Sequence, residues 1–311
     1  MIYTVTLNPA LDKTVEIPSM TVDRVNRITS MRTDPGGKGI NVSKVLRKLG
    51  GRSIACGILA GHTGESILSA LHEMGIETLF YMGEGETRTN LKIVDPVCHT
   101  NTDINEPGIT VTAQMLAELL GALTQRAVKG DIVVLTGSVP RGAPKYIYGT
   151  WGRSLSQKGA KIFLDADGEL LRYGLRAEPF LVKPNNYELS ALMGQELTEI
   201  PEIRRAAAAL IKEYNVRRVV VSMGERGALY VSKGECIYAK GLKVPVGSTV
   251  GAGDSVVAAL AFAEEKGMSL GEAARLSTAA GAANVMCSGS QAAEYETIQE
   301  LLGKVKLNIL E

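Results

Sequence analysis

The segment 248–255 carries the residues of this chain that are best suited to chemistry. It reads Ser-Thr-Val-Gly-Ala-Gly-Asp-Ser and leads into an apolar stretch, 256–264, that is typical of a buried helix. Because Gly251 and Gly253 lack side chains, the turn can bring several backbone N–H groups to one point at the positive end of that helix. Such a point attracts a phosphate or a transition-state oxyanion. A carboxylate beside it, Asp254, suits a base that takes a proton from an attacking hydroxyl.

Asp254 also has a simpler interpretation as a helix N-cap. Gly-x-Gly-Asp is short and common, so this segment alone leaves both interpretations open. A second glycine-rich turn, Pro-Gly-Gly-Lys-Gly at 35–39, precedes a helix predicted over 40–49. It is similar to the end of a Walker A loop, but no Ser or Thr follows Lys38 and no Gly stands five residues before it. We therefore reject a P-loop.

Seven ordered segments carry a resemblance to a known family. They are Asn8-Pro9-Ala10-Leu11-Asp12, Gly-Gly-Lys-Gly-Ile-Asn at 36–41, Thr87-Arg88-Thr89-Asn90, Gly137-Ser138-Val139-Pro140, Lys183-Pro184-Asn185-Asn186-Tyr187-Glu188, Ser222-Met223-Gly224 and the stretch 249–254. Nearly end to end, the chain resembles the PfkB, or ribokinase-like, family of carbohydrate kinases. Asn-Pro-x-x-Asp at 8–12, Val-Asn-Arg at 25–27 and the segment 103–108 are most similar to its 1-phosphofructokinase branch, with tagatose-6-phosphate kinases close behind.

Short apolar runs alternate with helical periodicity along the chain. Strands are predicted at 3–8, 54–59, 132–136, 162–165, 180–182 and 219–222, and helices at 66–74, 113–126, 188–193 and 203–214. This alternation predicts an α/β fold with a mostly parallel central sheet and helices on both faces. Ser138, Asp165, Asn185 and Gly224 each come at or just after the end of a strand. They should therefore meet at the carboxyl edge of the sheet, where ligands bind in such folds.

Two stretches, about 12–34 and 79–105, alternate polar and apolar residues and suggest exposed antiparallel strands. No linker, charge block or convincing repeat divides the chain, so we expect a single domain over 1–311 despite the length. The resemblance implies that the two stretches form a small β lid over the sugar. It also implies that the lid pairs two subunits into a homodimer.

The resemblance also assigns roles to single positions. Phosphoryl transfer requires an anion cradle, a divalent metal, a base and polar groups that hold the acceptor. The base would be Asp254, with the N–H groups of Gly251, Ala252 and Gly253 stabilising the transferred charge. The sugar phosphate would be bound by Asp12, Gly37, Lys38, Asn41 and Arg88, with Ser138, Arg27 and Arg141 as further candidates. ATP would be bound by Lys183, Asn185, Ser222, Gly224 and Gly227, with Ser248 and Thr249 nearby, and Mg²⁺ by Glu188.

Several of these residues have structural interpretations that remain open. Asn41 could be a helix cap and Asp12 a solvated turn residue. Arg27 could lie on a solvated strand face, as charged strand residues usually do. Glu188 in Asn-x-x-Glu could equally be a first-turn acid beside a capping Asn. The nucleotide preference and a monovalent-cation site near Val250 and Ala252 stay undecided, and 281–290 shows no clear adenine-pocket motif.

The activity implied is ATP-dependent and Mg²⁺-dependent phosphorylation of fructose 1-phosphate to fructose 1,6-bisphosphate, by in-line attack of the 6-hydroxyl on the γ-phosphorus. Tagatose 6-phosphate or fructose 6-phosphate remain alternatives with the same mechanism. A non-catalytic sugar-phosphate sensor is a remote alternative, since a sensor needs no base. A dinucleotide-dependent oxidoreductase is disfavoured, because no Gly-x-Gly-x-x-Gly follows the first predicted strand.

Composition agrees with a soluble enzyme. The chain has 311 residues, 45% of them hydrophobic, and 34 basic against 33 acidic side chains give no field suited to nucleic acid or an anionic membrane. The sequence shows neither a secretory signal nor a membrane-spanning run, so we expect a cytoplasmic protein. Its four cysteines are widely separated and are expected to be reduced. With three histidines, a nucleophilic triad lacks support.

Overall fold

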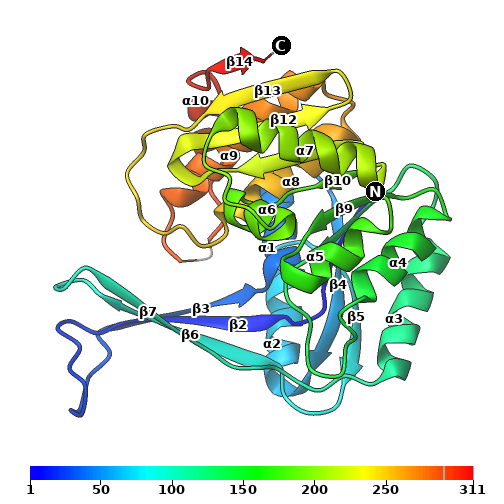
Figure 1. Cartoon of the computed structure of the whole chain (residues 1–311). Coiled ribbons are helices and arrows are strands. Elements are labelled where there is room, and N and C mark those ends of the chain that lie inside the picture. The colour runs from blue at the N-terminus through cyan, green and yellow to red at the C-terminus, as the bar shows by residue number, and fades with distance from the viewer. Residues whose placement is uncertain (290, 311) are drawn as a thin grey trace.

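The computed structural model of the protein describes residues 1–289 and 291–310. Its largest element is a mixed sheet whose parallel part comprises β1 (Ile2–Thr6), β4 (Ser53–Ala60), β5 (Glu77–Gly83), β8 (Ile132–Thr136), β9 (Lys161–Asp165), β10 (Leu181–Val182) and β11 (Arg218–Ser222). An antiparallel edge adds β12 (Gly227–Ser232), β13 (Glu235–Lys240) and β14 (Leu307–Ile309). The order across the sheet is β14-β13-β12-β11-β10-β9-β8-β1-β4-β5 (Figure 1).

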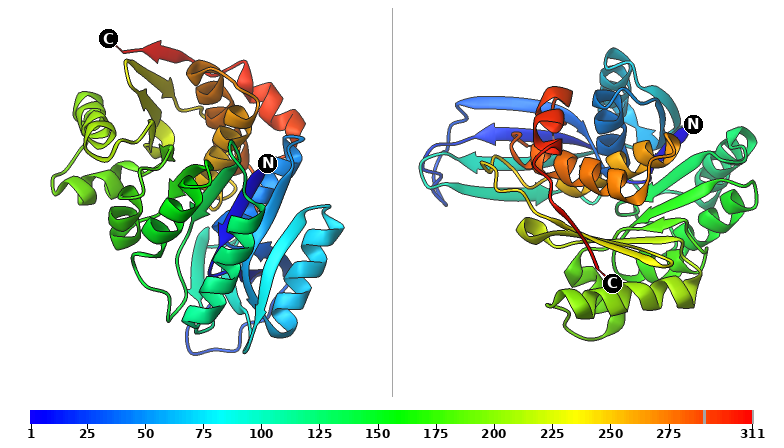
Figure 2. Two further views of the ribbon diagram at one scale, coloured as in Figure 1. Left: turned by 90° about the vertical axis from the view of Figure 1, so that its right-hand side faces the viewer. Right: turned by 90° about the horizontal axis from the view of Figure 1, so that it is seen from above.

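Helices cover both faces of this sheet (Figure 2). One face carries α3 (Ala113–Arg126), α4 (Ile147–Ser156), α5 (Gly168–Leu175), α6 (Asn186–Met193) and α7 (Ile200–Tyr214). The other carries α1 (Lys38–Lys48), α2 (Gly61–Glu73), α8 (Ala252–Glu265), α9 (Leu270–Val285) and α10 (Tyr295–Leu302). A single 3-10 turn, η1 (Gly224–Arg226), joins β11 to β12. The predicted α/β class, with a mostly parallel sheet between two helical layers, is confirmed.

The apolar strands explain why two layers are needed. Successive side chains of a strand point to opposite faces, so a strand that is apolar throughout must be covered twice. In β8, Val133 and Leu135 belong to the core under α3 and α4, whereas Ile132 and Val134 belong to the core under α1 and α8. All of β1, β4 and β8 is buried.

A second, smaller sheet projects from this body (Figure 1). It consists of β2 (Ala10–Glu16), β3 (Ser30–Gly36), β6 (Arg88–Asp95) and β7 (Thr100–Asn105) in the order β3-β2-β6-β7. Val15, Ile17 and Ile93 form its own small apolar cluster. The loop 17–29 between β2 and β3 lies at the end of this sheet away from the main body and is mostly exposed (Figure 1). We call this element the small sheet.

The predicted lid boundaries need correction. Residues 79–83, which were expected in the lid, belong to β5, and β5 pairs in parallel with β4 at the edge of the large sheet. Alternation of polar and apolar residues marks any half-buried strand, so it cannot tell a lid strand from an edge strand of the main sheet. The small sheet is also not purely antiparallel, because β2 and β6 run parallel.

Candidate active site

A cavity of about 1760 Å³ is lined by residues at the carboxyl ends of the large-sheet strands and by residues of the small sheet. It is lined by most of the residues predicted from the sequence: Asp12, Gly37, Lys38, Asn41, Arg88, Ser138, Lys183, Asn185, Glu188, Ser222, Gly224, Gly227, Thr249, Gly251, Ala252, Gly253 and Asp254. Residues from both ends of the chain therefore meet at one place, as the strand-end argument predicts.

Three predicted residues do not line the cavity. Arg27 lies exposed in the loop 17–29 of the small sheet. The side chain of Arg141 is also exposed, while its backbone bridges to Thr110. Ser248 is buried behind the glycine-rich turn, where its hydroxyl accepts a hydrogen bond from the N–H of Val250 at 3.2 Å and contacts Lys92 Nζ at 3.4 Å. Ser248 therefore shapes the turn, and the two arginines make no contact with this chain's own cavity.

The glycine-rich turn has the local geometry that an anion site requires. Gly251 is the N-cap of α8 and has a φ of 81°, a left-handed conformation that glycine adopts without a steric penalty. Helix α8 begins at Ala252, so the N–H groups of its first turn lack intrahelical acceptors, and Gly251, Ala252 and Gly253 line the cavity. The Ala252 N–H is directed at Thr249 O, at a long 3.4 Å, which leaves Gly253 as the better donor for a bound oxyanion.

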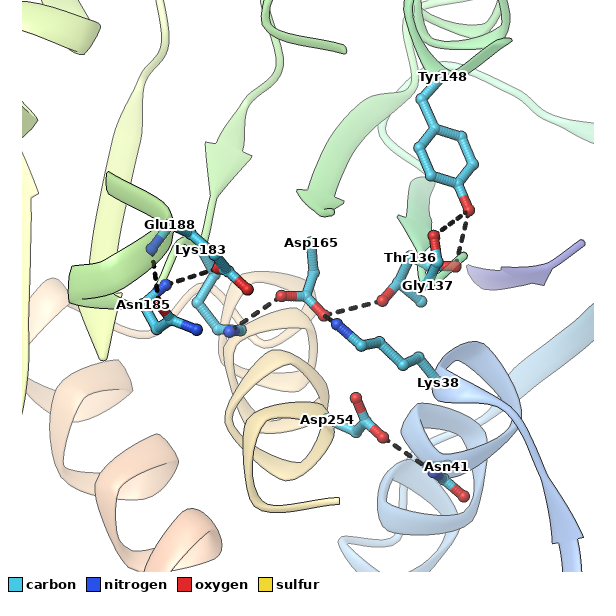
Figure 3. Close-up of polar contacts among 10 residues, drawn as sticks. All are labelled: Lys38, Asn41, Thr136, Gly137, Tyr148, Asp165, Lys183, Asn185, Glu188 and Asp254. Atoms are coloured by element: carbon cyan, nitrogen blue, oxygen red, sulfur yellow. Dashed lines mark hydrogen bonds and ion pairs between the residues drawn. The ribbon is translucent and has the colours of Figure 1, made fainter. Parts of the chain in front are cut away.

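Asp254 occupies the first turn of α8 and is buried, with 6% of its surface exposed. Burial raises the pKa of its carboxyl to about 6, against the opposing effect of Lys38. Asn41 of α1 donates a hydrogen bond from Nδ2 to Asp254 Oδ2 at 2.9 Å, so one carboxylate oxygen is held and the other faces the cavity (Figure 3). A carboxylate with a pKa near neutrality and one oxygen facing a cavity suits a general base.

Asn41 thus has a different partner from the one expected. It was predicted to hold the sugar, yet its amide bonds to the predicted base. Its Nδ2 carries a second hydrogen, which remains available to a substrate oxygen. A hydrogen bond therefore connects the segment 36–41 directly with the segment 251–254.

The centre of the site is an ionic cluster around Asp165, at the end of β9 (Figure 3). Asp165 accepts from Lys183 Nζ at 2.9 Å, from Thr136 Oγ1 at 2.9 Å and from Lys38 Nζ at 3.4 Å. Burial alone would raise the pKa of Asp165, but Lys183 and Lys38 outweigh it and hold the pKa at about 2. Asp165 in turn raises the pKa of Lys38.

Asp165 therefore joins two predicted binding groups that come from different parts of the sequence. Lys38 is the lysine of the sugar-side turn, and Lys183 begins the nucleotide-side motif. The sequence placed Asp165 at this edge of the sheet but gave it no role, because a single Asp after a strand has no motif of its own. Two lysines predicted for phosphate binding, both in need of a counter-charge, are the signal that points to it.

The small sheet supplies the other wall. Asp12 on β2 and Asn90 on β6 are paired in register, and Asn90 Nδ2 donates to Asp12 Oδ1 at 3.0 Å. Asn90 Oδ1 is buried and has no hydrogen-bond partner among the described residues. A buried acceptor of this kind is costly unless a ligand donates to it, and a sugar hydroxyl is such a donor. Asn90 is a candidate binding residue that the sequence reasoning missed, although it ends the Thr-Arg-Thr-Asn motif.

Arg88 is held rigidly at the start of β6. Its guanidinium donates to the carbonyl oxygens of Asn8, Pro9 and Glu106 at 2.9, 3.3 and 3.2 Å. These bonds use three of its five N–H groups, so two remain for an anion in the cavity. Arg88 is thus a fixed cation at the small-sheet end of the cavity.

The Asn-x-x-Glu segment forms a helix cap in addition to lining the cavity. Asn185 Oδ1 accepts from the Glu188 N–H at 2.8 Å, and Glu188 Oε2 accepts from the Asn185 N–H at 2.8 Å (Figure 3). This reciprocal capping box begins α6. The structural interpretation that the sequence left open is therefore correct, and it fixes one oxygen of Glu188 while the side chain still lines the cavity.

The cavity ends in an apolar region that no sequence motif marked. Val246, Ala282 and Val285 line it, the last two within the stretch 281–290 that showed no adenine-pocket motif. Position 290 of that stretch lies outside the described residues. Small apolar side chains on α9 have no distinctive spacing, so only the folded chain shows that they face the same cavity as Lys183.

Metal and membrane features are limited within the described part of the chain. No group of three or more His, Cys, Asp or Glu side chains is placed to hold a metal ion there. This is compatible with Mg²⁺, which usually retains waters and binds through one or two carboxylates plus the substrate phosphates. None of the described helices is long and apolar enough to cross a membrane. The cysteines at 56, 98, 236 and 287 are free thiols.

A mostly parallel α/β fold with a glycine-rich helix N-terminus, a buried carboxylate and a cationic cluster at one sheet edge is typical of a phosphoryl-transfer enzyme. The sequence profile of the pfkB family carbohydrate kinases matches residues 5–298. The chain belongs to this family and is a carbohydrate kinase, as the resemblance implied. Membership of a kinase family implies ATP as the phosphoryl donor.

Individual relatives are similar over nearly the whole chain. A 1-phosphofructokinase of Rhodobacter capsulatus is 39% identical over 279 residues, which cover 89% of this chain and 88% of the relative. A 1-phosphofructokinase of Bacillus subtilis is 37% identical, with all of both chains covered. The crystal structure of phosphofructokinase-2 from Escherichia coli in complex with potassium superposes with a TM-score of 0.93 at 32% identity and covers 97% of this chain and 98% of that one. The same protein in complex with fructose-6-phosphate has a TM-score of 0.90 at 31% identity and the same coverage.

Proposed function

We propose that the protein transfers the γ-phosphoryl group of ATP to the 6-hydroxyl of fructose 1-phosphate, giving fructose 1,6-bisphosphate. The observation that carries this proposal is the placement of Asp254. Its carboxylate lies at the start of α8, beside the N–H groups that would receive the phosphoryl group, and in one cavity with groups suited to a sugar and to a nucleotide. The similarity to 1-phosphofructokinases supports the choice of fructose 1-phosphate.

In this proposal the sugar lies against the small sheet. Asp12 and Asn90 Oδ1, which has no partner within the described part of the chain, accept hydrogen bonds from its hydroxyls, and Arg88 binds its phosphate at the far end. This orientation leaves the opposite end of the ketose facing Asp254. Fixing both ends of the acceptor converts the reaction into an effectively unimolecular one, which is the main contribution a kinase makes.

The chemical step then needs a base and charge neutralisation. Asp254 takes the proton from the 6-hydroxyl, and the oxygen attacks the γ-phosphorus while the bond to the ADP oxygen breaks. The N–H groups of Gly251, Ala252 and Gly253 stabilise charge on the phosphoryl oxygens. Lys183, with Asn185, Ser222, Gly224, Gly227 and Thr249, holds the nucleotide, and the apolar region at Ala282 receives its base.

A ketose 6-phosphate is the second candidate substrate. The Escherichia coli phosphofructokinase-2 that superposes on this chain is known in complex with fructose-6-phosphate, which carries its phosphate at the other end. To decide, ADP release would be measured with Mg²⁺-ATP and fructose 1-phosphate, fructose 6-phosphate, tagatose 6-phosphate or unphosphorylated fructose at matched concentrations. We expect a clear preference for fructose 1-phosphate. A preference for either 6-phosphate would overturn the substrate, and no turnover with any of the four would favour a sensor.

Glu188 is proposed to hold the Mg²⁺ that accompanies ATP, through the carboxylate oxygen that the capping box leaves unused. Glu188→Gln tests this role, because Gln also completes a capping box but carries no charge. We expect the Mg²⁺ concentration for half-maximal rate to rise at least about tenfold, while the melting temperature changes little. The matched control is Glu202→Gln, at the same position in the capping box of α7. Equal Mg²⁺ requirements in the two variants would contradict the proposal.

A monovalent cation near the glycine-rich turn is a further element of the proposal, as one superposed structure contains potassium. The carbonyl of Val250 is the available ligand there, and it already accepts from Asn284 Nδ2 at 2.9 Å. A carbonyl oxygen has two lone pairs, so it can still bind a cation. Turnover with K⁺, Na⁺ or neither would decide this.

The protein is further proposed to form a homodimer through the small sheet in the cytoplasm. Apolar side chains are concentrated on its tip and outer strands: Val22 and Val25 are 86% and 83% exposed, and Ile28, Met31 and Ile104 are each more than half exposed. Exposed apolar patches of this kind mark interfaces. We expect light scattering to give twice the chain mass and Val22→Asp with Val25→Asp to give the single chain mass. A wild-type monomer at micromolar concentration would contradict this.

A further inference from the structure

Lys44 of α1 is a buried cation for which neither the family motifs nor the proposed reaction provides a role. Only 7% of the surface of Lys44 is exposed. Its ammonium donates to the carbonyl oxygen of Pro35 at 3.1 Å and contacts Asn41 Oδ1 at 3.4 Å. Asn41 is the residue whose Nδ2 donates to Asp254 Oδ2 at 2.9 Å. A continuous path of polar contacts therefore runs from Lys44 to the proposed base.

This path fixes the orientation of the Asn41 amide. Lys44 carries only donors, so it selects the carbonyl oxygen of Asn41 as its partner and turns the NH₂ group towards Asp254. In the reversed orientation, Asn41 Oδ1 would face a carboxylate oxygen and its NH₂ group would face an ammonium. Both contacts would be repulsive. The side chain of Asn41 alone has no such preference, because a rotation of 180° about its last bond changes its shape very little.

We propose that Lys44 is a positioning residue for the catalytic base: through Asn41 it determines which oxygen of Asp254 faces the substrate hydroxyl, and its fixed charge favours the ionised form of that carboxylate. The inference rests on the proposed role of Asp254. With Oδ2 engaged by Asn41, the proton of the sugar hydroxyl goes to the other oxygen, the one that faces the cavity (Figure 3).

The surrounding charges agree with this role. Lys44 lies in the field of Asp12 from β2, of Asp34 and Arg32 from β3, and of Asp254 from α8. Burial lowers the pKa of Lys44, while the three carboxylates oppose that shift. On its other sides Asp254 is faced by Lys38 from α1, Asp165 from β9 and Lys183. Lys44 and Asp254 therefore interact electrostatically in addition to their link through Asn41.

Lys44→Met removes the charge and the donor but keeps the length of the side chain. We expect kcat to fall about tenfold or more. A carboxylate displaced by a fraction of an ångström from the substrate hydroxyl loses much of its effect as a base. We also expect the acidic limb of the pH profile of kcat/KM to move to higher pH by about half a unit or more, because the Asp254 carboxylate loses a nearby cation. The KM for ATP should stay within about twofold, since Lys44 does not line the cavity that holds the nucleotide groups.

Two comparison variants separate positioning from general damage. Lys44→Arg retains the charge, so the acidic limb of its kcat/KM profile should lie at the same pH as in the wild type. Lys48→Met, on the same helix but with an exposed side chain paired to Glu294, should leave both kcat and the limb unchanged. The pH at which kcat/KM falls to half its maximum does not depend on how much of the sample is folded. This pH therefore remains informative if Lys44→Met is less stable.

The inference fails if Lys44→Met keeps the wild-type limb and loses no more than twofold in kcat. It also fails if the loss is the same at every pH and Lys44→Arg does not reverse it, since that pattern indicates packing alone. Asp254→Asn distinguishes this outcome from failure of the proposed function. If Asp254→Asn keeps its turnover, Asp254 is not the base. If Asp254→Asn is inactive while Lys44→Met behaves as wild type, only the role of Lys44 is wrong.

Discussion

Asp254→Asn should lose about 10²- to 10⁴-fold in kcat while the KM values for sugar phosphate and ATP change little. The substitution removes the base but keeps the shape of the side chain and an oxygen that can accept from Asn41 Nδ2. In the proposed mechanism binding depends on other residues of the cavity, namely Asp12 and Arg88 for the sugar and Lys183 for the nucleotide. Steady-state ADP release, together with calorimetric titration of each substrate, measures the two effects separately.

The raised pKa of Asp254 adds a pH dependence to this prediction. The carboxylate must be ionised to act as base, so kcat/KM of the wild type should decline as the pH falls below about 6, where the pKa lies. Asp254→Asn should show no such decline in its residual activity. The free energy of unfolding should change with pH in the opposite direction to kcat/KM. Because the pKa of folded Asp254 is higher than in the unfolded chain, ionising it lowers the free energy of unfolding as the pH rises from about 4 through 6.

The magnitude of this destabilisation is on the order of 2–3 kcal/mol at neutral pH. Asp254→Asn should therefore be at least as stable as the wild type at pH 7.5, and more stable if the new amide is well accommodated. Glu300→Gln is the control, as it makes the same acid-to-amide exchange on the exposed surface of α10. Near-normal turnover of Asp254→Asn would show that Asp254 is not the base. A variant with lost turnover and lost sugar binding would indicate a different role.

Asp165→Asn should be the most destabilising single exchange in the site, at about 3–5 kcal/mol. It leaves Lys183, whose side chain is 6% exposed, as a buried cation without its carboxylate partner. Lys38, with a side chain that is 42% exposed, should suffer less because water reaches it. Both lysines lose the group that positions them, so the KM for sugar phosphate and the KM for ATP should both rise, each by about tenfold or more.

The free energy of unfolding in urea and the two KM values test this prediction together. Asp131→Asn is the matched control: Asp131 is also buried and pairs with the amino terminus at 3.0 Å, far from the cavity. It should lose stability without any change in either KM. Since the pKa of Asp165 is held near 2, its contribution to stability is present above about pH 4 and is lost only as the pH falls through 2. An effect confined to one substrate would show that Asp165 supports only one of the two lysines.

Much of the fold could be predicted from the sequence because its strands are apolar throughout. The predictions at 132–136 and 113–126 coincide with β8 and α3. Local signals with a clear physical basis also worked: the glycine-rich turn at 251–253 does begin a helix, and Asn-x-x-Glu does form a cap. These features depend on residues close together in the chain, which a sequence displays directly.

The features that were missed depend on contacts between distant residues. Nothing in the segment 161–165 indicates that Asp165 binds lysines 127 positions before it and 18 after it. Asn41 was assigned to the sugar because the family motif places it there, and its bond to Asp254 spans 213 positions. Helix α9 was not predicted at all, since its small residues are buried on most sides and show no polar face. Arg27 was assigned to the site as a possible phosphate-binding cation, but it is exposed in the loop 17–29, none of whose residues lines the cavity.

The parallel pairing of β2 with β6 has a consequence for how substrate preference can change. Asp12 and Asn90 stand opposite each other in that pairing, and Arg88 stands opposite Ala10 two positions earlier. Inserting or deleting one residue inside either strand would turn these side chains to the opposite face, whereas a change of length in the loop 17–29 would leave them in place. New sugar specificities should therefore arise in this family by exchange of side chains or of the whole small sheet, with loops free to vary in length. The residues proposed to bind the nucleotide belong to the large-sheet part of the chain and would not need to change.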